Sequence, residues 1–435
     1  MEKAVSPTRW EQALGAVLRN HGAPGPDGMT VQQLEQHLRV HGETIRRRLL
    51  EGRYQPGAAR RREIAKPDGG TRPLSIPNVQ DRFVGQLLLG VLQPLFEPSF
   101  SAHSYGFRPD RSAHQAVEAA RKYAKEGYTW VVDMDITQFF DHVNHDLLMS
   151  RLAQRVKDKR VLRLIGAFLR AGVVMPDGVL VRSEEGTPQG GPLSPLLANV
   201  YLDALDRELD KRGLRYVRYA DDCNIYVRSE AAAQRVLAGL TQWIARHLRL
   251  QVNPTKSGTG RPWERKFLGF VILMTMLVGV APKSLARFED RTRQLWDARQ
   301  SLTSEELRDQ WRDYLRGWWA YYRLAEDRRP LFDTEPWIRR HIRKCFWLRW
   351  HKANGRHAAL VGLGVPPERA RRAAYSSGGA WRMARHPAMH EALSNQRLRQ
   401  TQMLMPSDLA RLDEQVSNRR MRKTARPVVW EPRRA

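Results

Sequence analysis

Four aspartates lie in two short segments whose residue types could bind metal ions. Asp221 and Asp222 are adjacent within Tyr219-Ala-Asp-Asp222, and Asp133 and Asp135 alternate along an otherwise apolar run. Adjacent carboxylates in a tight turn repel each other, so a fold tolerates them best when a cation shares the site. For Asp221 and Asp222 alone, a metal-free turn would be the simpler interpretation, because aspartate favours turns.

The second source of carboxylates favours a metal site. Residues 130–136 predict a strand, on which Asp133 and Asp135 share one face because strand side chains alternate. Carboxylates on a buried strand and on a neighbouring hairpin tip can hold two Mg²⁺ ions about 3.5–4 Å apart, the spacing for in-line phosphoryl transfer. We therefore expect phosphoryl transfer with two metal ions, although spacing does not say whether Asp133 or Asp135 is the ligand.

The elements that position these carboxylates can be predicted from the apolar pattern. The runs 216–219 and 224–227 are strand-like and are separated only by Ala220 to Cys223, which predicts a β-hairpin with Asp221 and Asp222 at its tip. After the first strand, apolar residues recur at helical spacing, at Val143, Leu147, Leu148 and Leu152. Strands and helices mix between 60 and 283, so we expect an α+β fold.

The region beyond residue 283 is expected to be helical. Thr303 and Glu306 have the spacing of a capping box, which predicts a helix start. A later helix places Ile338, Ile342, Phe346 and Trp350 on one stripe, and we interpret that stripe as core. The basic residues off the stripe suit a phosphate backbone, and they are Arg339, Arg340, Arg343 and Lys344.

Composition limits the class of partner. The chain has 435 residues and a formal net charge of +27, with a sequence pI near 10.7. So many like charges destabilise a compact chain unless a partner neutralises them, so we expect nucleic acid rather than a membrane. Cys223 and Cys345 are the only cysteines, which excludes a disulfide framework and a Cys-x-x-Cys zinc site. The start of the chain lacks the apolar core of a signal peptide, and we expect a cytoplasmic protein.

Several blocks together resemble one protein family. Tyr219-Ala-Asp-Asp222 is preceded by Asp135-Ile-x-x-Phe-Phe-Asp141 and by the block Gly186-Thr-Pro-Gln-Gly-Gly-Pro-Leu-Ser-Pro195. The other blocks are Lys66-Pro-Asp-Gly-Gly-Thr-Arg-Pro-Leu74, Ser104-Tyr-Gly-Phe-Arg-Pro109, Asn253-Pro-Thr-Lys-Ser257 and Phe267-Leu-Gly-Phe270. In this order the chain resembles the reverse transcriptases encoded by bacterial group II introns. The resemblance covers nearly the whole chain.

The resemblance implies a right-hand polymerase with fingers, a palm whose antiparallel sheet carries the Tyr-Ala-Asp-Asp hairpin, and a helical thumb. It also implies that Asp135, rather than Asp133, is the strand's metal ligand, because the family's ligand lies four residues before the first Phe of the pair. Asp135, Asp221 and Asp222 would then be catalytic and bind two Mg²⁺ ions, and the backbone carbonyl of Ile136 would complete one coordination shell.

The resemblance further implies a dNTP site. Phe139 matches the ring that lies under the deoxyribose and excludes a 2′-hydroxyl, with a core Phe as the alternative. Lys66 and Arg72 match residues that grip the triphosphate, and a hairpin turn between them would bring both to one tip. Gln189 matches the residue beside the nucleotide, in a loop before a helix that Ser194 is expected to cap. Lys256 matches a lysine often suggested to protonate departing pyrophosphate.

Four domains and a set of nucleic-acid partners follow from the same resemblance. We expect an N-terminal extension (1–60), fingers and palm (61–283), a thumb or maturase domain (284–355), and a basic DNA-binding region with a tail (356–435). The expected partners are the group II intron RNA, an RNA template with its DNA primer, target DNA and dNTPs. The lack of paired cysteines after the thumb resembles the endonuclease-lacking lineage. The oligomeric state is not predicted.

Three other functions could use the same residues. An RNA-templated RNA polymerase would share the fold, but Phe139 argues against it. A splicing cofactor without polymerase activity would have discarded the aspartates, whereas Asp135, Asp221 and Asp222 are all present. A domesticated group II-like reverse transcriptase acting in defence or repair stays open, because the chain does not reveal whether an intron surrounds its gene.

Overall fold

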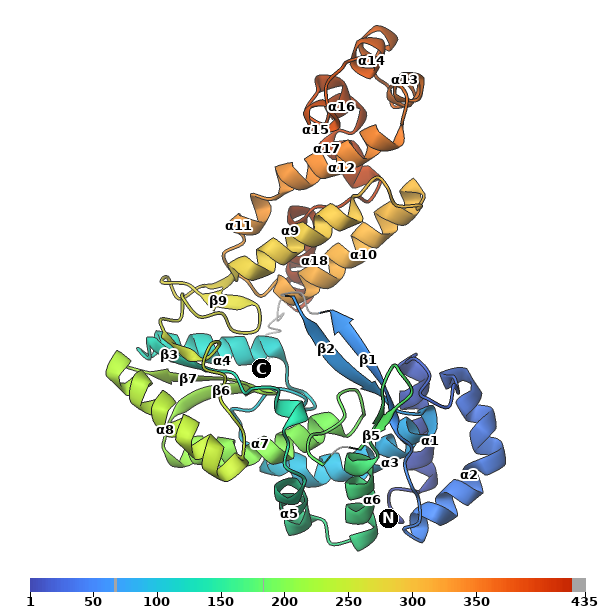
Figure 1. The fold of residues 1–435 in the computed structure, drawn as a ribbon. Coiled ribbons are helices and arrows are strands. Elements are labelled where there is room, and N and C mark those ends of the chain that lie inside the picture. Colours follow the sequence, from blue (N-terminus) through green and yellow to red (C-terminus); the bar gives the residue numbers. More distant parts are fainter. Residues whose placement is uncertain (66–68, 183, 425–435) are drawn as a thin grey trace, which may run out of the picture. The chain divides into compact units, whose positions relative to one another are not determined.

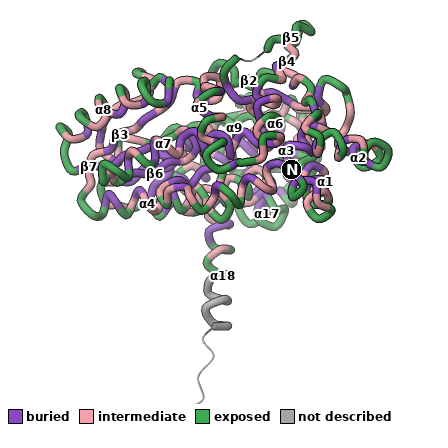
Figure 2. Tube along the Cα trace, turned by 90° about the horizontal axis from the view of Figure 1, so that it is seen from below, coloured by how far each residue is buried: buried purple, intermediate pink, exposed green. Residues whose placement is uncertain are grey.

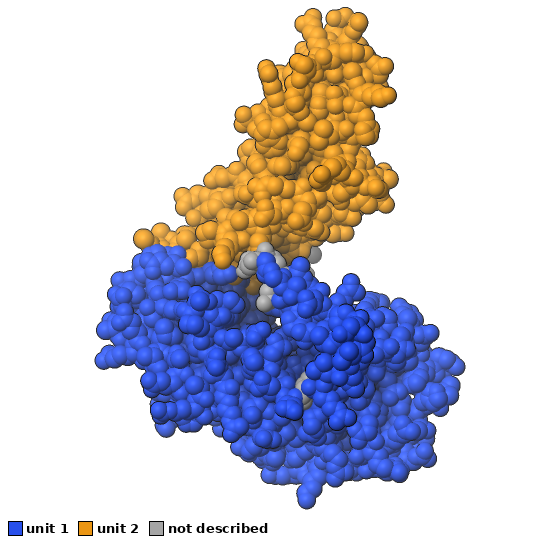
Figure 3. All heavy atoms as spheres, viewed as in Figure 1, with its two compact units in different colours: residues 1–268 blue, residues 269–435 orange. Residues whose placement is uncertain are grey.

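The computed structural model describes residues 1–65, 69–182 and 184–424, with side chains up to residue 415. It divides into two compact units, Met1–Leu268 and Gly269–Ala435, which are coloured separately in Figure 3. The first unit ends before the expected boundary near 283. The apolar run 270–281 therefore belongs to the second unit, where it forms the hairpin of β9 (Phe270–Ile272) and β10 (Val278–Val280).

An antiparallel sheet in the first unit carries the predicted hairpin (Figure 1). Its strand order is β6 (Arg215–Tyr219), β7 (Asp222–Val227), β3 (Trp130–Met134) and β8 (Gly258–Gly260). Helix α4 (Ala113–Lys125) packs against β6 and β7, and α8 (Glu230–Leu248) packs against β3, β7 and β8. The predicted hairpin is confirmed, with only Ala220 and Asp221 between its strands.

A second sheet has the order β2-β1-β4-β5. Strands β1 (Ala59–Ala65) and β2 (Thr71–Ile76) pair antiparallel, with Ile64 opposite Arg72. This is the hairpin expected around Arg72, although its tip at 66–68 lies outside the described residues. The short strands β4 (Val173–Val174) and β5 (Leu180–Val181) complete the sheet.

The helices of the first unit share one hydrophobic core (Figure 2). Trp10 in the N-terminal extension packs edge-on against Phe83, with ring centroids 4.8 Å apart, so the expected boundary near 60 is not an edge of the core. The remaining helices of this unit are α1 (Pro7–Arg19), η1 (Val31–Gln33), α2 (Leu34–Leu50), α3 (Val79–Phe96), η2 (Glu97–Ser99), η3 (Phe139–Asp141), α5 (His145–Arg155), α6 (Lys159–Arg170) and α7 (Ser194–Lys211).

The second unit is helical after its hairpin, as expected. Thr303 forms the predicted capping box with Glu306 at the start of α10. A second hydrophobic cluster extends from Phe288 to Ala410, so the boundary expected near 355 crosses a continuous core. Its helices are α9 (Pro282–Leu295), α10 (Ser304–Tyr322), α11 (Arg329–Phe332), α12 (Glu335–Arg349), α13 (Ala353–Gly362), α14 (Pro367–Ala374), α15 (Ala380–Met383), α16 (Pro387–Ala392), α17 (Asn395–Gln400) and α18 (Pro406–Thr424).

Most of the Gly/Pro-rich stretch 354–367, which follows the expected boundary near 355, forms α13. Leu360 and Val365 from this stretch are buried in the second core, and that burial stabilises the helix despite its glycines. Within the described chain, we find no helix both long and apolar enough to cross a membrane.

Candidate active site

The β6–β7 hairpin and the end of β3 bring three aspartates to one end of the sheet. Tyr219 and Asp222 form the last pair of the hairpin, and Ala220 adopts a left-handed conformation with φ +58° in the turn. On the other side of β7, Met134 pairs with Cys223. Asp135 therefore follows the last β3 pair directly and lies beside the Asp221–Asp222 turn.

The electrostatics agree with this proximity. Removal from water, followed by the charges of Asp221, Asp135 and Asp133, raises the pKa of Asp222 to about 7, although its side chain still reaches solvent. Burial and the charge of Asp135 also raise the pKa of Asp221, while Arg72 lowers it. Mutual repulsion of this kind is relieved by a bound cation.

Asp133 occupies a different position from Asp135. It lies within the sheet, opposite Asn224 of β7 and Gly258 of β8. Burial raises its pKa to about 6, and Asp135 adds to the shift. A group inside the ladder is less free to turn towards a ligand than one beyond the last strand pair.

Lys256 supplies a cation at the same end of the sheet. Its Nζ lies 3.2 Å from Oδ2 of Asp135. The segment that carries it is held against Asp135 by two hydrogen bonds, from the Asn253 amide to the Asp135 carbonyl and from the Asp135 amide to Ser257 Oγ. Among the residues described, no three or more His, Cys, Asp or Glu side chains form a ready ligand cluster.

A buried arginine, Arg218, stabilises the turn that carries Asp221 by a hydrogen bond to its backbone. It is 0% exposed and pairs with Asp206, its Nε donating to Oδ1 at 2.7 Å. Its Nη1 donates to the Ala220 carbonyl at 2.8 Å and to Asn199 at 3.1 Å, and its Nη2 donates to Ser104 at 2.8 Å. The carbonyl of the turn is therefore fixed by a side chain that cannot move without leaving Asp206 buried and unpaired.

The segment 104–108 is clamped against the same turn. The Tyr105 amide donates to the Arg218 carbonyl at 2.8 Å, and Asn199 Nδ2 donates to the Gly106 carbonyl at 2.9 Å. A Cβ on Gly106 would lie 2.2 Å from the Ala220 nitrogen, so only glycine fits there. This block was recognised only as part of a resemblance, and the role of Arg218 was not predicted; its signal in the sequence is an arginine that follows the apolar residues Tyr216 and Val217.

The Gln189 loop lines a small cavity of about 160 Å³ together with Phe140, Asp141 and Ser75. The Ser75 amide donates to the Gln189 carbonyl at 2.7 Å, which ties the loop to β2. Ser194 does not cap the following helix as expected. It is the first helical residue, and its hydroxyl donates to the Pro188 carbonyl at 2.6 Å.

The burial of Phe139 disagrees with its expected place beneath a nucleotide. The ring is 2% exposed and packs in the core against Phe140 and Tyr201, with centroids 5.2 and 6.2 Å away. A ring enclosed in this way cannot touch a sugar, which favours the core alternative. Phe140 is the half-buried ring of the pair and the one that lines the Gln189 cavity.

The other predicted dNTP residues differ in what the structure shows. Lys66 lies outside the described residues. Arg72 is exposed on β2 and close enough to Asp221 to affect its pKa. Ile136 is buried and forms a bridge with Val252, so its backbone lies at the end of β3 beside Asp135.

The basic face predicted on α12 is largely occupied by the protein itself. Arg343 is 4% exposed and donates to the Leu393 carbonyl at 3.1 Å. Arg340 stacks on Trp381, its guanidinium carbon 3.8 Å from the ring centroid. Arg339 pairs with the buried Glu335 at 2.6 Å, and Lys344 is half-buried. The apolar stripe is buried as predicted, but helices further along the chain cover the basic side.

Two protein-family models match this chain. Residues 64–272 match the reverse transcriptase (RNA-dependent DNA polymerase) family, and residues 285–361 match the group II intron maturase-specific domain. The chain therefore contains a reverse transcriptase domain followed by a group II intron maturase-specific domain. The reverse transcriptase domain contains the three aspartates at the end of the sheet, and the maturase-specific domain extends from α9 into α13.

Several known proteins are similar to parts of this chain. The chain is 37% identical over 219 residues to the protein YkfC of Escherichia coli, a match that covers 49% of this chain and 57% of YkfC. It is 39% identical over 160 residues to the group II intron-encoded protein LtrA of Lactococcus lactis, covering 37% of this chain and 26% of LtrA. Among solved structures, a telomerase from Candida albicans matches 82% of this chain and 65% of its own, with 12% identity and a TM-score of 0.43.

Proposed function

We propose that this protein is an RNA-directed DNA polymerase that uses two Mg²⁺ ions bound by Asp135, Asp221 and Asp222. The observation that carries the proposal is the meeting of these carboxylates at one end of the sheet, where the charge of Asp135 raises the pKa values of Asp221 and Asp222. The donors are carboxylate oxygens, which Mg²⁺ prefers. Bound there, the two ions would activate the primer hydroxyl and stabilise the charge that develops on the phosphate.

The surrounding residues would orient the substrates. Arg72 lies close enough to Asp221 to pair with phosphates held there, and Lys66 is proposed to join it at the hairpin tip. Lys256, now paired with Asp135, could hold a proton near the departing pyrophosphate. The Ile136 carbonyl is proposed as a further metal ligand, and Arg218 keeps the turn in place through its bond to Ala220.

We propose that Phe140, and not Phe139, is the ring that excludes nucleotides with a 2′-hydroxyl. Phe140 lines the same cavity as Gln189, whereas Phe139 lies in the core. A ring at the floor of the nucleotide site would leave no room for a 2′-hydroxyl. Gln189, which lines the same cavity, would contact the nucleotide as well.

We further propose that the protein binds its group II intron RNA and assists splicing and mobility. The match to the maturase-specific domain favours this second function. The basic side chains of α12 mostly contact other parts of this protein. We therefore assign the phosphate contacts to exposed arginines nearby in the chain, in particular Arg371 and Arg372 of α14. Target DNA and the intron from the same locus would be the remaining partners.

The polymerase proposal is tested by extending a DNA primer on an RNA template with purified protein, dNTPs and Mg²⁺. We expect full-length cDNA that depends on the metal and on the template. A preference for ribonucleotides would favour an RNA polymerase instead. If the protein binds the intron RNA and promotes splicing but never extends a primer, the splicing-cofactor alternative holds.

A further inference from the structure

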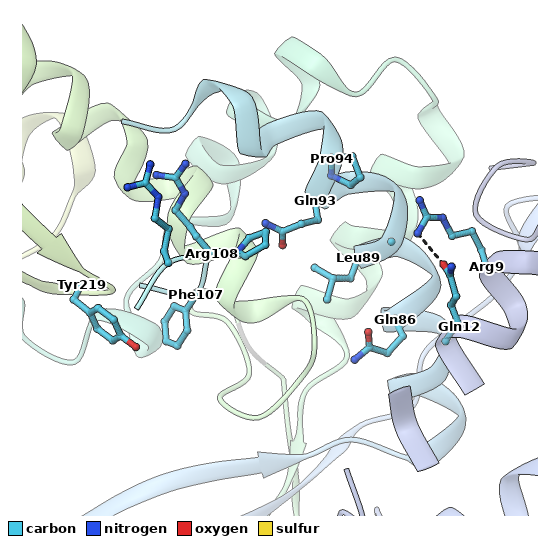
Figure 4. Close-up of a pocket in the computed structure, with 13 residues that line it drawn as sticks. Arg9, Gln12, Gln86, Leu89, Gln93, Pro94, Phe107, Arg108 and Tyr219 are labelled. Carbon is cyan, nitrogen blue, oxygen red and sulfur yellow. Dashed lines mark hydrogen bonds between the residues drawn. The ribbon is translucent and has the colours of Figure 1, made fainter. Parts of the chain in front are cut away.

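A cavity of about 640 Å³ opens beside the catalytic turn, within the first unit (Figure 4). Helix α1 contributes Arg9 and Gln12, α3 contributes Gln86 and Gln93, and the hairpin contributes Tyr219. Among its described lining residues none is acidic, and the cationic and amide groups are those that bind phosphates, sugars and base edges. The lining combines these polar groups with apolar side chains such as Leu89 and Phe107, a combination that fits a segment of nucleic acid.

Phe107 enters this cavity in a costly conformation. The residue is 43% exposed, and its backbone has φ +60°, a left-handed value that is unusual for a bulky side chain. In Figure 4 the ring lies on the cavity side of its loop, between Tyr219 and the α3 residues. Glycine or asparagine would adopt this backbone more easily, and a polar residue would be better solvated.

The chain on both sides holds Phe107 in place. Before it, Gly106 is packed against Ala220 with no space for a Cβ, and its carbonyl accepts from Asn199. After it, Arg108 pairs with Glu97 at 2.8 Å and donates to the Ser104 carbonyl at 2.8 Å. Strained backbone persists where its surroundings over-determine it, and such positions concentrate at ligand sites.

Core packing does not explain a ring with this exposure. An exposed aromatic face beside arginines is the arrangement on which nucleic-acid bases stack, whatever their sequence. The segment 104–108 is also bonded to Arg218, so the ring has a fixed position relative to the Asp221 turn. A nucleotide stacked on Phe107 would therefore be held in register with the catalytic carboxylates.

We propose that Phe107 is a nucleic-acid-stacking residue, whose ring seats one nucleotide of the primer–template in the cavity beside Tyr219. This inference rests on the proposed polymerase function and deepens it. In this arrangement the cavity at Phe107 binds the primer–template, and the smaller cavity at Gln189 and Phe140 binds the incoming dNTP. Phe107 is thus a substrate-binding residue, and it takes no part in proton transfer or metal binding.

The test compares Phe107→Gly, which removes both ring and backbone strain, with Phe107→Trp, which keeps an aromatic face. Affinity for a fluorescent RNA–DNA primer–template is measured in EDTA, so that catalysis is not needed. We expect Phe107→Gly to weaken binding about tenfold or more, while Phe107→Trp stays near wild type. The melting temperature of Phe107→Gly should not fall, and its KM for dNTP at saturating primer–template should be unchanged.

A second measurement locates the stacked base. 2-Aminopurine is placed at successive positions of the template and then of the primer. We expect the fluorescence of 2-aminopurine at one position near the primer terminus to be quenched by the wild type and by Phe107→Trp but not by Phe107→Gly.

Equal affinity of Phe107→Gly and wild type for the primer–template would overturn the proposal and leave the polymerase function intact. Loss of affinity that Phe107→Trp does not restore would also overturn it, since that pattern indicates a structural role. A wild type that binds primer–template but does not extend it would refute the polymerase function alone.

Discussion

The end of the β3–β7 sheet and the basic side of α12 were both predicted from residue types at regular spacing, but only one has the predicted arrangement. The aspartates are placed by local geometry, since a two-residue turn and the next residue after a strand bring them together. The α12 arginines depend on what packs against their helix, and there Arg343 is buried and Arg340 stacks on Trp381. A hairpin determines its own tip, whereas one helix does not determine which of its faces meets solvent.

The largest expected effect is the loss of primer extension when an aspartate at the end of the β3–β7 sheet is replaced. Asp221→Asn should lower primer extension by about a thousandfold or more, because it removes charge from the proposed metal site. Asp133→Asn is the matched control on the same sheet and should lose far less, since Asp133 lies inside the strand ladder. Both variants are checked by measuring the rate of primer extension on an RNA template and, in parallel, the affinity for RNA. If the two variants lose activity equally, the placement of Asp133 outside the metal site is wrong.

The second prediction sharpens the comparison within the helical unit. Arg343→Glu should destabilise the protein by roughly 3 kcal/mol or more, because a buried carboxylate would replace a hydrogen-bonded cation. The double variant Arg371→Glu/Arg372→Glu should fold normally, because both residues are exposed. Its intron-RNA affinity should fall, and the slope of log K against log salt should flatten by about one unit per lost phosphate contact.

Denaturant unfolding and filter binding at several salt concentrations separate these outcomes. A stable Arg343→Glu that loses only RNA affinity would restore the original prediction of an RNA-binding face on α12. An Arg371→Glu/Arg372→Glu protein with unchanged affinity and salt slope would exclude α14 from the RNA contact.

The third prediction separates two adjacent rings. Phe139→Ala should cost about 3–5 kcal/mol of stability, as expected for truncating a buried Phe. Phe140→Ala should cost less and should raise ribonucleotide incorporation relative to deoxyribonucleotides. Thermal melts and competition between rNTP and dNTP check the pair. Altered sugar selectivity in a stable Phe139→Ala variant would return that role to Phe139.

These rings show what the sequence could and could not establish. The hairpin and the capping box at Thr303 follow from local pattern and were predicted. Which of two adjacent rings faces the cavity depends on the turn after β3, where Gln138 takes a left-handed φ of +42° and η3 begins. Arg218 was missed for a related reason, since its partner Asp206 lies on α7 and no periodicity connects them.

The smallest expected effect concerns pH in the absence of metal. The folded pKa of Asp222 is about 7, above its ordinary value, so the stability it contributes is present below about pH 4 and is lost as pH rises through 7. Asp222→Asn should therefore melt slightly higher than wild type in EDTA at pH 8, and the difference should shrink as the pH falls towards 4. The difference should be small, because water screens this exposed side chain. A lower melting temperature for the variant at pH 8 would contradict this electrostatic account.

The most direct test of the central claim is a crystal structure of the protein with an RNA–DNA primer–template, a non-hydrolysable dNTP and Mn²⁺ in place of Mg²⁺. The anomalous signal of Mn²⁺ locates the ions independently of any assumed ligand. We predict two ions at the end of the β3–β7 sheet, in contact with Asp135, Asp221 and Asp222, with Asp133 outside their coordination and Lys256 moved away from Asp135. Ions bound through Asp133, or found elsewhere while the dNTP is in place, would contradict the account.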